Sequence, residues 1–415
     1  MRYGKLERFI ARLLEPFPGM RRSLKFNYQK LMYFLNRKDY SMKTKYPIRK
    51  FSYKNKESFF GYYDKSPIDS KNRFVIFHTS LVPTNCPPDP KIPIKITLCD
   101  LLNNEMRVVD ESYAYNWQQG SRLMWLSEGE FIYNVFEDGD FKAKIYNLNE
   151  GSTKVLPLPI YDCFKDQFAI SLNFERLCMW RKDYCYLNKG EFQDWANLDD
   201  GLYWLNLKTC EYKKLISFKD VIDLHFNEGM RDAKHKFNHV MISPSGKSAV
   251  FIHRWLTKNG RKYDALCYIT FDRNSIKVIA DWGMVSHYCW ISDSELFVYM
   301  RGPKGDGYYF LNVETGVMRY VDLLSDLGDG HPSYFCDRIV LDTYPNKSRF
   351  LELFLFNLTT GNLLKLGEFF QSFDYYGESR CDLHPRFSFD GRKIFFDSVH
   401  EGKRYLYMME LCDEE

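Results

Sequence analysis

The chain has 415 residues and a formal net charge of +4, and hydrophobic residues make up 45% of it, which is enough for a sizeable core. It contains no run of 18 apolar residues, so we expect no membrane-spanning helix, and we find no secretory signal sequence with a cleavage site. The aromatic content of 17% favours strands over helices.

Charge is distributed unevenly along the chain. Residues 1–50 carry 14 Lys and Arg and 3 Asp and Glu, a net charge of +11, which leaves a net charge of −7 for the remainder. The basic head and the mildly acidic body are therefore expected to have different partners. We expect no nucleic-acid partner, and we expect a cytoplasmic protein that is either free or peripheral on the inner face of the cytoplasmic membrane.

The basic head has the pattern of two amphipathic helices. Apolar residues recur at helical spacing over residues 4–14 and 21–37, and Lys and Arg occupy the other face. Basic amphipathic helices suit an anionic membrane surface. A solvated appendage docked on the body, or a site for a protein partner, would have the same pattern.

The eleven cysteines form no CxxC pair and have no regular spacing. Free thiols inside apolar runs pack as small hydrophobic residues. The cysteines that mostly lie in such runs are Cys178, Cys185, Cys267, Cys289 and Cys336. We therefore expect reduced core cysteines in a reducing compartment.

An internal repeat follows from about residue 45. One half of it is a polar start, a turn and an apolar strand, and the other half is two strands joined by an Asn/Asp- and Gly-containing turn. Four-stranded propeller blades have this size, and a unit that cannot bury its own face must stack on its neighbours. The seven copies start, 44 to 66 residues apart, at Asp64, Gln119, Asn173, His239, His287, His331 and His384.

The sequence thus predicts an all-β, seven-bladed β-propeller of four-stranded blades over residues 45–415, after a basic helical segment at residues 1–44. The last copy ends one strand short. A strand at residues 47–53 could complete that blade and close the ring, which would leave no open sheet edge.

Four of the nine histidines occupy the same position in four consecutive repeats, just before the innermost strand of each predicted blade. Propeller symmetry would gather His239, His287, His331 and His384 around one mouth of the central channel. Neutral imidazoles suit Mn, Fe, Zn or Ni. We expect a divalent-metal site or a polar ligand site there, with bonding to a neighbouring blade as the structural alternative for each histidine.

The other blades place further polar and aromatic residues at the same mouth. Aromatic faces stack on sugar rings, and arginine binds carboxylates in bidentate fashion, so the set suits an acidic oligo- or polysaccharide. An ion pair with an adjacent blade is the alternative for each arginine. The residues expected to bind substrate are Tyr63, Asp64, Lys65, Trp117, Gln119, Arg181, Tyr184 and Arg380.

Three of these repeats resemble a known family. The run His239 to Gly246 with its Ser-Pro-Ser-Gly, then Ser286-His287-x-x-Trp290 and Gly330-His331-Pro-Ser, resembles the oligogalacturonate lyases, which are propeller polysaccharide lyases related to TolB-like repeats. The similarity covers mainly residues 60–412. The signatures GYYDKSP, NWQQGSRLMWL and DGHPSY also resemble uncharacterised propeller proteins encoded among bacterial capsule and surface-polysaccharide biosynthesis enzymes.

The resemblance implies metal-assisted β-elimination on a uronate-containing glycan. It implies a divalent metal, typically manganese, at His287 and His331, with His384 as an added ligand. His239 would be the base that removes the proton α to the carboxylate, and Arg176 or Arg386 would clamp that carboxylate. The glutamine that the lyases place near the later histidine pair has no counterpart here.

Two other functions stay open at this point. A non-catalytic glycan-binding or scaffold propeller in capsular polysaccharide biosynthesis would account for the basic head and for the incomplete ligand pattern. A glycosyltransferase of the same pathway is the third, although no nucleotide-sugar fold favours it.

Overall fold

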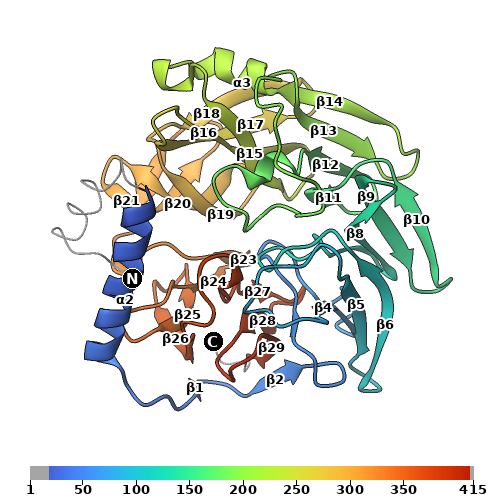
Figure 1. Cartoon of the computed structure of the whole chain (residues 1–415), viewed down its shortest axis with the longest axis vertical. Coiled ribbons are helices and arrows are strands. Elements are labelled where there is room, and N and C mark those ends of the chain that lie inside the picture. Colours follow the sequence, from blue (N-terminus) through green and yellow to red (C-terminus); the bar gives the residue numbers. More distant parts are fainter. Residues whose placement is uncertain (1–17, 412–415) are drawn as a thin grey trace.

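The structure is a computed structural model that describes residues 18–411, with side chains from Ser23 onward. Seven antiparallel sheets follow one another around the molecule (Figure 1). Six of them contain four consecutive strands, ordered from the centre outward, and the seventh combines three consecutive strands with one from the N-terminal part of the chain. This architecture confirms the seven-bladed β-propeller.

Blades one to three come from the first half of the chain. Blade one contains β3 (Ser58–Phe59), β4 (Phe74–Thr79), β5 (Ile94–Asp100) and β6 (Glu105–Ser112). Blade two contains β7 (Met124–Ser127), β8 (Glu130–Glu137), β9 (Asp140–Asn147) and β10 (Ser152–Leu156). Blade three contains β11 (Asp162–Phe164), β12 (Phe168–Leu172), β13 (Gly201–Asn206) and β14 (Tyr212–Ser217).

Blades four to six follow in the same manner. Blade four contains β15 (Lys234–Ile242), β16 (Ser248–Leu256), β17 (Lys262–Thr270) and β18 (Ser275–Ala280). Blade five contains β19 (Val285–Trp290), β20 (Glu295–Gly302), β21 (Gly305–Asn312) and β22 (Met318–Tyr320). Blade six contains β23 (Ser333–Phe335), β24 (Arg338–Asp342), β25 (Phe350–Asn357) and β26 (Leu363–Phe370).

Blade seven joins the two ends of the propeller. Its strands are β27 (Arg386–Phe387), β28 (Lys393–Ser398), β29 (Tyr405–Glu410) and the N-terminal β2 (Ile48–Phe51), which pairs antiparallel with β29. The predicted closing strand is therefore confirmed. Phe51 at its end is fully buried, with ring centroids 6.0 Å from Phe77 of blade one and 6.2 Å from Phe395 of blade seven.

The core lies between the blades. The middle strands face a neighbouring sheet on both sides, so they read as continuous apolar runs instead of alternating ones. In β16, for example, every residue from Ser248 to Trp255 is buried. Short helices occupy the connections, namely η1 (Arg176–Cys178), α3 (Phe218–His225), η2 (Glu228–Met230), η3 (Asp322–Leu324) and η4 (Gly377–Ser379).

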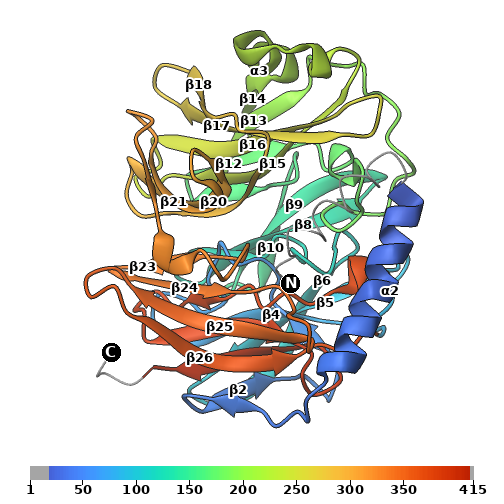
Figure 2. The same cartoon turned by 90° about the vertical axis from the view of Figure 1, so that its left-hand side faces the viewer.

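A helix precedes the propeller. α2 (Pro18–Asn36) confirms the helix expected at residues 21–37, while the one expected at 4–14 lies outside the described residues. Helix α2 runs along the outside of the propeller (Figure 2). The short strand β1 (Lys43–Thr44) then pairs with β26 as a fifth strand of blade six. In the described part of the chain, no helix has both the length and the apolar character needed to cross a bilayer.

One predicted blade start is wrong. Asn173 follows β12, whereas the innermost strand of blade three is β11 (Asp162–Phe164). The apolar strand followed by a polar turn at residues 168–176 has the pattern of a start, but it belongs to the second strand and the connection after it. Arg176, Arg181 and Tyr184 therefore lie in the long β12–β13 connection.

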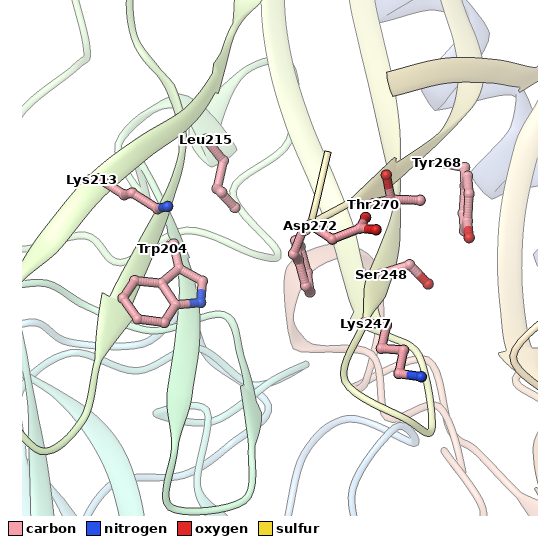
Figure 3. Close-up of a pocket in the computed structure, with 9 residues that line it drawn as sticks. Trp204, Lys213, Leu215, Lys247, Ser248, Tyr268, Thr270 and Asp272 are labelled. Atoms are coloured by element: carbon pink, nitrogen blue, oxygen red, sulfur yellow. The ribbon is translucent and has the colours of Figure 1, made fainter. Parts of the chain in front are cut away.

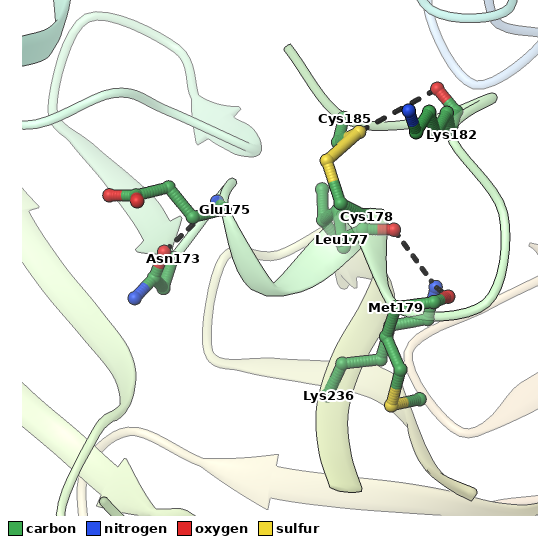
Figure 4. Close-up of a disulfide and its surroundings, with 8 residues drawn as sticks. All are labelled: Asn173, Glu175, Leu177, Cys178, Met179, Lys182, Cys185 and Lys236. Carbon is green, nitrogen blue, oxygen red and sulfur yellow. Dashed lines mark hydrogen bonds between the residues drawn. A yellow bond between two sulfur atoms is a disulfide. The ribbon is translucent and has the colours of Figure 1, made fainter. Parts of the chain in front are cut away.

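That connection contains a disulfide, which corrects the expectation of reduced cysteines. Cys178 and Cys185 are bonded to each other (Figure 4). The folded connection brings two residues seven positions apart into contact, and their spacing alone gives no sign of this. Disulfides are typical of oxidising compartments, so this bond does not support the predicted cytoplasmic location, which stays a prediction. The other cysteines of residues 18–411 are free, and of those expected in the core Cys336 is exposed.

Removal of the disulfide is expected to have a moderate effect. Replacing both Cys178 and Cys185 by serine should lower the free energy of unfolding by about 2 kcal/mol, because the unfolded chain regains the freedom of the short closed loop. Urea unfolding measures this change, with Cys86→Ser, at an exposed free thiol, as the control. An unchanged midpoint for the double variant would show that the bond adds no stability.

Candidate functional site

The structure brings the four repeated histidines into one buried cluster. The ring centroids of His287 and His331 are 4.1 Å apart, those of His331 and His384 are 4.3 Å apart, and those of His239 and His287 are 5.6 Å apart. All four side chains are at least 95% buried. Residues up to 145 positions apart in the chain therefore meet at the propeller axis, as the repeat predicts.

Local backbone irregularities aim these side chains. His239 and His287 lie within β15 and β19, not before them, and each coincides with a β-bulge that shifts the strand register. His384 stands just before β27. His239 and His384 have φ angles of +51° and +47°, in the left-handed region that costs a non-glycine residue about 1–3 kcal/mol. Such strain is typical of functional positions.

Three buried groups in this cluster have the arrangement of metal ligands. One ligand atom each from His331, Asp382 and His384 lies within 4.8 Å of the other two. Nε2 of His331, Nε2 of His384 and Oδ1 of Asp382 are all buried without a hydrogen-bond partner. A buried polar atom without a partner is costly, and a cation held by these three side chains would satisfy such atoms by accepting their lone pairs. No other cluster of this kind occurs within residues 18–411.

The remaining polar atoms of the three groups are held by neighbours. Nδ1 of His384 lies 2.9 Å from the carbonyl oxygen of Gly61, which only accepts, so the proton is on Nδ1 and the Nε2 lone pair is free. Nδ1 of His331 lies 2.9 Å from a carboxylate oxygen of Asp342. The second oxygen of Asp382 accepts a hydrogen bond from Arg380 at 2.8 Å. Partners of this kind orient the ligands of metal sites.

The pKa values of the two histidines of the trio shift in opposite directions. Burial lowers the pKa of His384 well below its usual range, so its imidazole is neutral at neutral pH. Burial also acts to lower the pKa of His331, but the Asp342 carboxylate outweighs it and the net pKa is raised. Nitrogen and carboxylate oxygen donors in this combination fit manganese, and zinc or iron as well.

Gly61 is required at the base of the trio. Its φ of +119° is unfavourable for other residues, and a Cβ there would lie 2.8 Å from the backbone carbon of Gln119. The amides of Phe60 and Gly61 donate to the Asp397 carboxylate at 2.9 and 3.0 Å. The close approach lets the Gly61 carbonyl reach His384.

His287 and His239 flank the trio. Nδ1 of His287 lies 3.1 Å from Asp329, and His287 is not among the three side chains whose possible ligand atoms lie within 4.8 Å of one another, so its role as a ligand stays a prediction. Nδ1 of His239 lies 2.6 Å from the hydroxyl of Tyr62, and the two rings stack at 5.4 Å. The hydroxyl of Tyr288 donates to the His239 carbonyl and fixes its backbone.

Four of the predicted substrate residues reach this mouth. The ring of Tyr63 contacts His287, His331 and His384. Arg380 forms ion pairs with Asp183 and Asp382, and its Nη2 lies 3.4 Å from the hydroxyl of Tyr184. Arg181 pairs with the same Asp183 and leaves 44% of its side chain exposed. Arg181, Tyr184 and Arg380 therefore line one wall of the mouth.

The other four lie in buried structural contacts. Asp64 forms a bidentate ion pair with Arg122 at 3.1 and 2.7 Å, and Lys65 pairs with Asp162 of blade three. Trp117 Nε1 donates to a backbone carbonyl at 2.7 Å, and the Gln119 amide donates to Tyr161 at 2.9 Å. These contacts link blades one to three, so these side chains are occupied within the fold.

Neither of the two arginines expected as carboxylate clamps is free. Arg176 is 1% exposed, bonds to Asp200 and to backbone carbonyls, and lies under the ring of Phe192. Arg386 is also 1% exposed and lies 3.2 Å from Asp397, while its Nη1 donates to the carbonyl of His384 at 2.6 Å. Arg386 therefore holds the backbone of His384 in place.

Two basic residues on blade four lie close to His239 and were not predicted. Lys236 and Arg254 lie near enough to His239 to add to the lowering of its pKa, of which burial is the main cause. Lys236 donates to the carbonyls of Leu177 and Met179, and Arg254 pairs with Asp264. A charged residue within an apolar strand is the signal that would have marked both.

A separate pocket lies away from this cluster, between blades three and four (Figure 3). Strands β13 and β14 contribute Trp204 and Lys213 to one wall, and Tyr268 at the end of β17 and Asp272 after it contribute to the other. None of the predicted site residues lines it.

Comparisons with solved structures agree with the fold. An oligogalacturonate lyase in complex with manganese matches 91% of this chain and 97% of its own, with a TM-score of 0.65 and 15% identity. The oligogalacturonate lyase from Vibrio parahaemolyticus matches 91% of this chain and 99% of its own, with a TM-score of 0.61 and 12% identity. The β-propeller domain of the trilobed protease from Pyrococcus furiosus matches 86% of this chain and 97% of its own, with a TM-score of 0.50 and 11% identity. No protein-family profile and no curated protein matches the sequence.

Proposed function

We propose that this protein is a lyase-like enzyme that cleaves an acidic, uronate-containing glycan by metal-assisted β-elimination in a surface-polysaccharide context. The observation that carries the proposal is the trio of buried, unpartnered ligand atoms on His331, Asp382 and His384. The shared fold with a manganese-bound oligogalacturonate lyase supports it. A divalent metal at the trio, with manganese as the first choice, would supply Lewis-acid stabilisation of the uronate carboxylate.

His239 and Tyr62 are suited to move the proton. Burial lowers the pKa of His239 well below its usual range and raises that of Tyr62 well above it, so both are uncharged at neutral pH. The base role requires the tautomer in which Nδ1 of His239 donates to the Tyr62 oxygen. The Nε2 lone pair is then free to accept the proton α to the carboxylate.

Arg181 and Arg380 would bind the substrate carboxylate in place of Arg176 and Arg386, which are buried and ion-paired within the fold. Both guanidinium groups face the mouth beside Asp183, and Arg181 is exposed enough to meet a second charge. Tyr184 lies edge-on to His239 at 5.4 Å between their centroids and offers an aromatic contact for a sugar ring. These residues would orient the glycan so that its reacting carbon faces His239.

Non-catalytic binding of the same glycan is the second candidate. The observation that favours it is the burial of Arg176 and Arg386, each 1% exposed and ion-paired within the fold, which leaves the mouth without the expected clamp.

Turnover of uronate glycans separates the two candidates. With manganese present, oligogalacturonides or related uronate oligosaccharides should give the rise in ultraviolet absorbance of an unsaturated product. His239→Ala should lower kcat by about 10²- to 10⁴-fold while the bound metal is retained. His400→Ala, at a buried histidine outside the mouth, is the matched control. Binding without any product from every uronate glycan tested would reject the lyase and support the binding role.

A further inference from the structure

Helix α2 has apolar residues on two opposite faces. Phe26 and Tyr33 point to the propeller, where their rings lie 5.8 and 5.7 Å from that of Phe373. Leu24 and Leu31 are also seven residues apart. Each precedes the corresponding aromatic residue by two positions, which is a rotation of about 200° around the helix axis. The docked face is therefore aromatic, and a second apolar face points outward.

This outward face is exposed over most of the helix. Leu24, Leu31 and Leu35 form one stripe and are 49%, 54% and 63% exposed, and Phe34 beside them is 68% exposed. Single exposed apolar residues are common on soluble proteins, but four that adjoin on one helix mark a contact surface. We call these four residues the α2 stripe.

The charges around the α2 stripe select its partner. Residues 23–45 contain six Lys and Arg and a single acidic residue, Asp39. Exposed cations next to the stripe include Lys30, Arg37 and Lys38. Two copies of such a surface repel each other. An anionic bilayer instead accepts the apolar side chains at the acyl boundary and the cations among its headgroups.

We infer that the α2 stripe docks on an anionic membrane surface, with the helix lying in the plane of the interface. The aromatic face holds the helix to the connection between β26 and β27, where Phe26 also contacts Tyr376 at 4.7 Å. That connection continues to Arg380, Asp382 and His384. Docking would thus fix the orientation of the propeller and its mouth on the membrane. The inference does not depend on the proposed reaction.

Vesicle flotation of the full chain tests the inference. Vesicles of equal parts phosphatidylcholine and phosphatidylglycerol should bind the protein, and vesicles of phosphatidylcholine alone should bind it at least about tenfold less, since each basic residue near the surface adds to the attraction. The triple variant Leu24→Ser, Leu31→Ser and Leu35→Ser should bind the anionic vesicles at least about tenfold less than the unchanged protein. Its net charge and its thermal midpoint should stay the same, because these side chains are exposed.

A matched control uses apolar residues of similar exposure elsewhere. Leu102→Ser, Val317→Ser and Leu323→Ser lie on turns and connections of blades one and five, and together they should leave vesicle binding unchanged. Equal binding by the α2 triple variant and the unchanged protein would overturn the inference. So would a dimer in light scattering that the α2 variant dissociates, with no binding to vesicles, because the stripe would then be an interface between two copies.

Discussion

Replacement of His384 by alanine is expected to abolish binding of a divalent metal. The unchanged protein should hold about one manganese per chain, and the variant should hold none after dialysis, because one of three converging ligand atoms is removed. The dissociation constant should rise by more than about 100-fold, which exceeds the effect usual for a supporting residue. Elemental analysis and titration calorimetry measure the two quantities.

Two further variants make this result specific. Asp342→Asn keeps both proposed ligand histidines but weakens the partner of His331 Nδ1, so it should raise the dissociation constant by about 10- to 100-fold. His400→Ala removes a buried histidine outside the mouth and should leave the metal content unchanged. Unaltered manganese in His384→Ala would show that the metal binds somewhere else.

Replacement of Asp64 by asparagine is expected to cause the largest loss of stability. Asp64 and Arg122 are each 3% exposed at the side chain or less, and the variant would leave the buried Arg122 without its counter-charge. Breaking a buried pair in this way costs about 3–5 kcal/mol. Urea unfolding measures the loss, and Glu128→Gln, which breaks the exposed pair with Lys71, should leave the stability unchanged.

The pH dependence of this loss has a defined sign. Burial acts to raise the pKa of Asp64, but Arg122 outweighs it, and the folded pKa is lowered. A lowered pKa contributes stability above the unfolded value, and that contribution disappears as the pH falls through the folded value. The difference in the free energy of unfolding between the unchanged protein and Asp64→Asn should therefore become smaller as the pH falls. If Asp64→Asn kept full stability but bound glycan more weakly, Asp64 would instead be a substrate-binding residue.

The propeller and its histidine cluster follow from the repeat, because a blade motif fixes both the strand order and the position of each start around the axis. His239, His287, His331 and His384 share one position in the repeat, so symmetry alone brings them together. The closing strand at Ile48–Phe51 could be predicted for the same reason, since one blade lacked a strand.

The partners of the histidines could not be predicted in this way. Asp342 ends β24, and Asp382 lies in an irregular connection, so neither has a repeat position that points to the axis. The roles of Asp64, Arg176 and Arg386 also depend on which buried charge lies opposite, and pairs such as Asp64 with Arg122 join different blades. Sequence spacing locates a residue at the mouth or near it, but only the packing decides whether its charge is free.

The most direct test of the proposed metal centre is the position of bound manganese. Crystals grown with manganese should show one anomalous scattering peak per chain, within bonding distance of Nε2 of His331, Nε2 of His384 and Oδ1 of Asp382. A peak at any other place, or an empty mouth in crystals that bind manganese elsewhere, would contradict the assignment.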